Sequence, residues 1–176
     1  MSKYATITLP TELVNKALEK GIDLEELVIT ILIEKLDLNP SEVAKFRIEL
    51  AEKFLSEARE YISEGDAVQA SEEMYKAVEE CIKALAERFD TPEAREAHRE
   101  GRWWIKLLSR AAKTLSKKLN EPLINTAWSV AYDLHVWGFH EAALSPEHVE
   151  VNSPLIERLL EKTRQLLSQV PFKTEA

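Results

Sequence analysis

The sequence contains little glycine, little cysteine and a shortage of positive charge, and each shortage excludes a class of protein. Only 4 glycines occur among 176 residues, while strong helix formers are abundant, and this composition favours an all-α body. The single cysteine, Cys81, cannot form an internal disulfide, which indicates a reducing compartment. The formal net charge of -8 disfavours a protein that binds phosphate backbones broadly.

A long apolar run is also missing. No stretch of about 18 apolar residues is present, so no transmembrane helix is predicted. The first ten residues, MSKYATITLP, contain no apolar signal core. Hydrophobic residues nevertheless make up 45% of the chain, which is enough to fill a core. We therefore expect a folded, soluble, cytoplasmic protein without a membrane contact.

Residues 1–38 predict a strand-helix-helix segment. Residues 3–9, KYATITL, alternate between apolar and polar side chains as a half-buried β-strand does. Pro10 ends this strand, and Gly21 separates two short helical segments that continue to about residue 36. A single strand leaves its backbone groups unpaired, and the sequence contains no second convincing strand. We therefore expect the strand to pair with the same strand of a second subunit, which predicts a homodimer.

The same segment resembles the ribbon-helix-helix family through the stretches TITLPTEL, KGIDLEELV and LIEKL. In that family two strands form an antiparallel ribbon, and DNA-binding members insert outward strand side chains into the major groove. The resemblance implies that Lys3, Tyr4, Thr6 and Thr8 are the candidates for nucleic-acid contact. The ribbon carries little positive charge, however, and this disfavours DNA binding. Dimerisation is therefore the first role that we expect for this segment.

The remaining residues, 39–176, predict an up-and-down helical bundle. Asn39, Pro40 and Glu42 combine a capping side chain, a proline suited to the first helical position and a capping-box glutamate. Gly65–Asp66 then divides a helical hairpin, because glycine can close one helix and aspartate can cap the next. Three further helical regions are expected at about residues 91–119, 122–143 and 155–169.

The second helix of this hairpin, within residues 65–87, has an apolar arc that covers more than half of its circumference. An arc this wide indicates a helix that is contacted on two or three sides, with alanines that permit close approach. Cys81 lies in this arc and is expected to be a small core residue. The charged residues, which include the pairs Glu72–Lys76 and Glu79–Lys83, fall on the opposite side. We expect them to form a solvated face.

Two stretches of the chain resemble the archaeal PaREP family: LAEKFLSEAREYISEGDAVQASEEMYKAVEECIKALAERF and LHVWGFHEAALSPEHV. Together they organise roughly residues 45–165. The helical hairpin of that family resembles HEPN domains, which are helical bundles found in toxin–antitoxin systems and nucleotide-binding proteins. Active HEPN ribonucleases carry an arginine that is followed four to six residues later by a histidine. None of the 4 histidines here follows an arginine at that spacing, so the resemblance does not imply ribonuclease activity.

The strongest candidate for a site is LHVWGFHE, residues 134–141. On an α-helix His135 lies on the apolar side, and His140, five residues later, falls off that face. Histidines at this spacing are poorly placed to share a metal ion on an α-helix, so no metal site is predicted. The first interpretation of His135 is a hydrogen-bonded core histidine. The alternative is a functional residue that lines a pocket, for which Trp137 and Glu141 are further candidates.

Arg47 is the other unusual residue, because its charge falls in the middle of an apolar helix face and needs a partner. Glu79 or His135 is expected to provide that partner in a structural salt bridge, and a ligand-binding arginine is the alternative. If the protein is an enzyme, Arg47, His135 and His140 are the candidate catalytic residues. No glycine-rich phosphate loop is found, and no cofactor is predicted.

These patterns predict an all-α, HEPN-like, up-and-down helical bundle with a short N-terminal strand-helix-helix dimerisation arm. The function expected first is that of a non-catalytic dimeric binding or regulatory protein, such as a toxin–antitoxin or nucleotide-sensing component. One alternative is a HEPN-like ribonuclease or nucleotide-handling enzyme with an atypical arginine and histidine site. Another is a DNA-binding regulator that uses the N-terminal ribbon. The expected partners are a second copy of the chain and a further protein.

Overall fold

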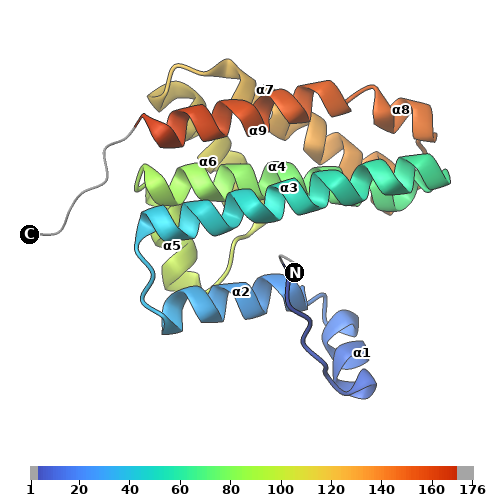
Figure 1. Ribbon diagram of the computed structural model, residues 1–176, viewed down its shortest axis with the longest axis horizontal. Helices are drawn as coiled ribbons and strands as arrows, with labels where there is room; N and C mark the ends of the chain where they lie inside the picture. Colours follow the sequence, from blue (N-terminus) through green and yellow to red (C-terminus); the bar gives the residue numbers. More distant parts are fainter. Residues whose placement is uncertain (1–3, 170–176) are drawn as a thin grey trace, which may run out of the picture. The chain divides into compact units, whose positions relative to one another are not determined.

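The computed structural model describes residues 4–169, and all regular structure within this range is helical (Figure 1). The chain divides into two compact units, Met1–Leu38 and Asn39–Ala176. The helical bundle expected from the sequence is confirmed in the second unit. No helix within the described range is long and apolar enough to cross a membrane.

The first unit contains the helices α1 (Thr11–Glu19) and α2 (Leu24–Lys35). Gly21 has a φ of 65°, a left-handed conformation that ends α1 at the position expected from the sequence. The Asp23 side chain accepts a hydrogen bond from the Glu26 N–H at 3.0 Å and thereby caps the start of α2. Local signals in the sequence therefore place both helices correctly.

The β-strand expected at residues 3–9 is wrong. Residues 4–10 belong to no helix or strand, and no strand occurs anywhere between residues 4 and 169. A strand is stable only where a neighbouring strand satisfies its backbone N–H and C=O groups, and the described part of the chain supplies no such neighbour. The alternating side chains of KYATITL are therefore not sufficient to form a strand, and the ribbon implied by the ribbon-helix-helix resemblance is absent.

The second unit is built around one long central helix, α4. The bounds of its helices are α3 (Pro40–Glu64), α4 (Ala67–Arg88), α5 (Pro92–Glu100), α6 (Ile105–Lys118), α7 (Pro122–Asp133), η1 (Leu134–His140), α8 (Pro146–Glu150) and α9 (Ser153–Ser168). Helix α4 contacts every other helix of this unit, and α3, α4 and α9 lie side by side (Figure 1). Residues of α4 therefore line most of the core.

Helices α3 and α4 form the hairpin that the sequence predicts. The Asn39 side chain accepts a hydrogen bond from the Glu42 N–H at 3.1 Å, and the Glu42 side chain accepts one from the Asn39 N–H at 3.1 Å. This reciprocal pair is a capping box at the start of α3. At the other end Gly65 has a φ of 81°, and the Asp66 side chain caps α4.

The solvated face expected on α4 is wrong for much of its charged strip. Lys83 is 1% exposed and Glu80 is 4% exposed, and Glu73 and Glu87 are also buried. Because so many helices contact α4, they cover part of its charged side as well as its apolar arc. Buried charges of this kind need partners within the protein. One such partner is Glu79, which pairs with Lys83 and also contacts Tyr75.

Candidate functional site

The two histidines of LHVWGFHE lie on a π-helix. Helix α7 leads directly into η1, whose backbone is π-helical over Leu134–His140. In a π-helix the N–H of residue i+5 bonds to the carbonyl of residue i, so positions five apart lie about one turn apart. On an α-helix the same two positions would be about 140° apart around the axis. The expectation that His140 lies off the face of His135 is therefore wrong, because it assumed α-helical geometry.

Gly138 allows η1 to lie directly against α4. This glycine is buried, and a Cβ atom built on it would lie 2.5 Å from the Cβ of Ser71. Ser71 is itself held in place, because it is buried and its Oγ donates a hydrogen bond to the Ala67 carbonyl at 2.7 Å. Only glycine therefore permits this approach between the two helices.

His135 is held between a carboxylate, an aromatic ring and a second imidazole. Its Nδ1 lies 2.7 Å from Oε2 of Glu72 on α4. Its ring stacks on Tyr75 with 4.2 Å between the centroids. Its Nε2 lies 3.1 Å from Nε2 of His140, whose ring meets it edge-on. The fold thus brings the two predicted histidines together and orients one of them.

The site runs from the core to the surface. Tyr75 is buried, Glu72 and His135 are partly buried, and His140 is exposed. The Glu72 carboxylate accepts a hydrogen bond from Nδ1 of His135 and so fixes the neutral tautomer in which Nδ1 carries the proton. The other nitrogen, Nε2, faces His140 with its lone pair. This chain of groups can hold or transfer a proton, or it can present imidazole nitrogens to a ligand at the surface.

Tyr75 links the histidine site to the buried charges of α4. Burial raises the pKa of the Tyr75 hydroxyl, and the adjacent Glu79 carboxylate, to which this hydroxyl donates a hydrogen bond, raises the pKa further. The same Glu79 lies 2.6 Å from Nζ of Lys83. Tyr75 therefore stays neutral and acts as a hydrogen-bond donor rather than as a base.

Arg47 lies in a buried ion-pair cluster. Its Nη1 lies 3.0 Å from Oε2 of Glu80, and Oε1 of Glu80 also accepts a hydrogen bond from Nζ of Lys83 at 3.0 Å. Arg47 is 2% exposed. The partners expected from the helical pattern were Glu79 or His135. The salt bridge instead uses Glu80, the neighbour of Glu79 in the sequence, and His135 contacts Glu72. The arginine is thus in a salt bridge that joins α3 to α4.

Cys81 is a core residue, as the helical pattern predicts. It is 1% exposed, and burial raises the pKa of its thiol to about 12. The thiolate is the reactive form of cysteine, and this environment disfavours it. Cys81 is therefore not a candidate nucleophile.

Trp137 and Glu141 lie beside the histidines in the chain and are both exposed, with 54% of Trp137 accessible. They are close to the two histidines in the sequence and lie at the protein surface. Between residues 4 and 169 no group of three or more histidine, cysteine, aspartate or glutamate side chains is arranged to hold a metal ion. Any ion bound at the histidines would therefore have fewer than three ligands of these types from the described chain.

The residues expected to contact nucleic acid are not presented on a ribbon. Tyr4, Thr6 and Thr8 are exposed in a segment without regular structure, and Lys3 lies outside the described residues. Reading a DNA groove requires side chains in a fixed register, which the expected pair of strands would have provided. Residues 4–10 contain no strand that would hold Tyr4, Thr6 and Thr8 in such a register.

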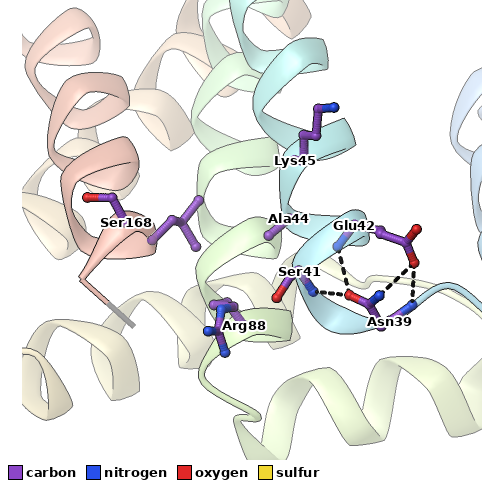
Figure 2. A pocket seen from close by; sticks show the side chains of 8 residues that line it. Asn39, Ser41, Glu42, Ala44, Lys45, Arg88 and Ser168 are labelled. Carbon is purple, nitrogen blue, oxygen red and sulfur yellow. Dashed lines mark hydrogen bonds between the residues drawn. The ribbon is translucent and has the colours of Figure 1, made fainter. Parts of the chain in front are cut away.

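A surface hollow of about 400 Å³ lies at the far end of α4 from the histidines. It is lined by the start of α3, by Arg88 and by the end of α9 (Figure 2). Asn39 and Glu42 in this hollow are hydrogen-bonded to each other as a helix cap (Figure 2). Arg88 follows Glu72 by sixteen residues on α4, which corresponds to about 24 Å along the helix axis. This hollow is therefore separate from the histidine site.

The helical pattern does not identify Glu72 and Tyr75 as site residues. They lie three positions apart on α4, one in the charged strip and one in the apolar arc. A polar side chain at the boundary of an apolar arc can reach a neighbouring helix. This boundary position is the sequence feature that could have identified Glu72 as a site residue. The partner across the boundary, His135, depends on how η1 packs against α4.

Residues 46–160, which include both α4 and η1, match a known protein family, the archaeal PaREP1/PaREP8 family. A crystal structure of a protein from Sulfolobus solfataricus is also similar. Its sequence identity is 35% and its TM-score is 0.61, over 67% of this chain and 96% of that chain. No curated protein matches the chain. The chain therefore belongs to the archaeal PaREP1/PaREP8 family.

Proposed function

We propose that the protein is a non-catalytic binding or regulatory protein whose ligand site is formed by Glu72, His135 and His140. The observation that carries this proposal is the contact between the two imidazoles, whose Nε2 atoms are 3.1 Å apart. The contact depends on a π-helix and on a glycine buried against Ser71. Both features are unfavourable relative to an ordinary α-helix, and π-helices are frequent at functional sites.

The other reactive groups near α4 are already engaged, which supports binding rather than catalysis. Arg47 and Lys83 are held in buried ion pairs, and the Cys81 thiol is buried with a raised pKa. The sequence also lacks the arginine and histidine spacing of active HEPN ribonucleases. An exposed imidazole, His140, next to an oriented one, His135, is what the site offers to a ligand.

The proposal has two further parts: the helical bundle is HEPN-like in arrangement, and the protein acts in a toxin–antitoxin or nucleotide-sensing system. The long hairpin of α3 and α4 within a helical bundle supports the first part. The exposed rings of Tyr132 and Trp137, on either side of His135 in the chain, support nucleotide sensing. Aromatic rings of this kind can stack on a nucleobase.

The test follows the imidazole NMR signals of His135 and His140 while adenine and guanine nucleotides are added to the full chain. We expect both signals to move, and we expect the signal of His148, an exposed imidazole on α8, to stay in place. His140→Ala should weaken nucleotide binding about tenfold or more, a change of about 1.4 kcal/mol, whereas His148→Ala should leave it unchanged. Full retention of binding by His140→Ala, or no binding by wild type, would contradict the nucleotide-sensing role.

A second candidate function is acid–base catalysis on RNA or nucleotides. It is favoured by the pairing of Glu72 with His135, because a carboxylate that orients an imidazole is typical of a general base. RNA cleavage that is lost in His135→Ala but kept in His148→Ala would support this enzyme. Intact RNA after incubation with the purified wild-type protein would remove it.

We propose in addition that the first unit mediates self-association. Large apolar side chains of this unit are exposed in unusual number: Ile7, Leu9, Leu13, Leu18, Ile22, Leu27, Ile31, Leu32 and Leu36. Helix α2 is apolar around most of its circumference, and such helices are normally covered on several sides. Exposed apolar surface of this kind is typical of a protein–protein interface. A second copy of the chain is the partner that we propose.

A further inference from the structure

The two Nε2 atoms at the histidine site are spaced like two ligands of one metal ion. We propose that His135 and His140 bind a divalent transition-metal ion of the zinc, copper or nickel class through these nitrogens. The inference rests on the proposed function, in which this site binds a ligand, and it names the class of that ligand. Histidine is the commonest protein ligand for such ions.

The distance between the nitrogens supports the proposal. A zinc–nitrogen bond is about 2.0–2.1 Å long, so two imidazole nitrogens on one tetrahedral ion are about 3.3 Å apart. At the 90° angles of six-coordinate ions the same bond length gives about 2.9 Å. The observed separation between Nε2 of His135 and Nε2 of His140 is 3.1 Å, which lies between these two values.

The orientation of His135 supports it as well. Histidines that bind metals usually donate their other ring N–H to a carboxylate, which fixes the tautomer and makes the bound nitrogen more basic. Glu72 has this position, because its Oε2 lies 2.7 Å from Nδ1 of His135. The stacked ring of Tyr75 limits rotation of the imidazole. One of the two ligands is therefore already oriented before an ion binds.

The charge of the surroundings favours a cation over an anion. Glu72 is part of the site, Glu141 follows His140 in the chain, and the whole protein has a formal net charge of -8. Since the described residues place no third histidine, cysteine, aspartate or glutamate to complete a metal site, water or an external ligand must occupy the remaining positions. Open positions of this kind let a bound ion take up a further ligand.

The experiment uses the full chain, stripped of metal, and titrates it with Zn²⁺ in a calorimeter. We expect one ion per chain at the site. His135→Ala and His140→Ala should each weaken binding by about tenfold or more, and Glu72→Gln should weaken it by about tenfold. His148→Ala and His98→Ala are the matched controls, because each removes one imidazole outside the site, and neither should change the affinity.

A second measurement needs no variant. Cu²⁺ added to the wild-type protein should give an electron paramagnetic resonance spectrum with hyperfine coupling to two imidazole nitrogens. A spectrum with one nitrogen, or Zn²⁺ binding that His140→Ala leaves unchanged, would overturn the metal site. If nucleotides still move the signals of His135 and His140 in that case, the proposed binding function stands without the metal. If metal binds and nucleotides do not, only the nucleotide-sensing role fails.

Discussion

Arg47 and Arg59 both lie on α3 and both pair with a glutamate of a neighbouring helix, yet only one of the pairs is buried. The Arg47–Glu80 pair is 3.0 Å apart and 3% of the arginine side chain is exposed. The Arg59–Glu157 pair is 2.7 Å apart and 56% of the arginine side chain is exposed. Removal of the arginine leaves Lys83 as the one cation shared by Glu79 and Glu80 in the first case and leaves a solvated carboxylate in the second.

We therefore expect Arg47→Met to lower the free energy of unfolding by about 3 kcal/mol, the lower end of the cost of breaking a buried pair. Glu80 loses one buried partner and keeps Lys83, which it then shares with Glu79. Arg59→Met, on the same helix, should cost less than about 1 kcal/mol. Unfolding of both variants and of wild type in guanidinium chloride measures the two losses. Equal and small losses would show that the Arg47–Glu80 pair is not buried in solution.

The need for a partner of Arg47 can be predicted from the sequence, because a charge on an apolar helix face cannot be left uncompensated. The identity of the partner cannot. Glu79 and Glu80 are adjacent on α4, and the rotation of α4 about its own axis decides which of them faces α3. That rotation results from the packing of the whole bundle.

At the scale of the element, η1 is what creates the candidate site. An α-helix over residues 134–140 would place His135 and His140 about 140° apart around the axis. The π-helix instead brings their Nε2 atoms to 3.1 Å. Gly138, between the two histidines, has no side chain to keep η1 away from Ser71. Packing against α4 and the conformation of η1 are therefore linked through this glycine.

Gly138→Ala is expected to lower the free energy of unfolding by about 1–3 kcal/mol, because its Cβ would overpack the contact with Ser71. It should also move the two imidazoles apart, because η1 must shift to accommodate the new methyl group. Chemical denaturation measures the first effect. The imidazole NMR signals of His135 and His140 report the second.

Ser71→Gly provides the control, because it removes the atom that the new Cβ would meet. The double variant is expected to recover most of the loss, except for about 1 kcal/mol that glycine costs within a helix. A double variant whose loss equals the sum of the two single losses would show that the Gly138–Ser71 contact is not the cause.

At the scale of the whole molecule, the exposed apolar residues of the first unit predict self-association. Leu32→Glu is expected to convert the proposed dimer to a monomer at equal protein concentration, because it places a charge in the proposed apolar interface. Val151→Glu is the matched control, since Val151 is also apolar and exposed but belongs to the second unit. Light scattering during gel filtration gives the mass of each variant. A monomeric wild-type protein, or a dimer that Leu32→Glu leaves intact, would contradict the proposal.

The sequence by itself determined where α3 begins and where the α3–α4 hairpin turns, because caps, glycines and prolines act within a few residues. It did not separate α5 from α6, which the expected helical region at about residues 91–119 joins, and it did not place α8. Asn39, Gly65 and Asp66 have the roles that their types predict. It also determined the family, through stretches that include α4 and η1. It did not determine a strand, because alternation of side chains describes one chain while a strand requires two.

Only the tertiary structure decided which polar groups of α4 are buried, which glutamate pairs with Arg47, and that His135 and His140 meet. Each of these depends on distances between residues that are far apart in the chain or on a helix geometry that local preference does not predict. The π-helix forms where Gly138 lies against Ser71, sixty-seven residues earlier in the sequence. The two histidines of the site were therefore visible in the sequence, but the role of Glu72 and the arrangement of all three follow from the packing of η1 on α4.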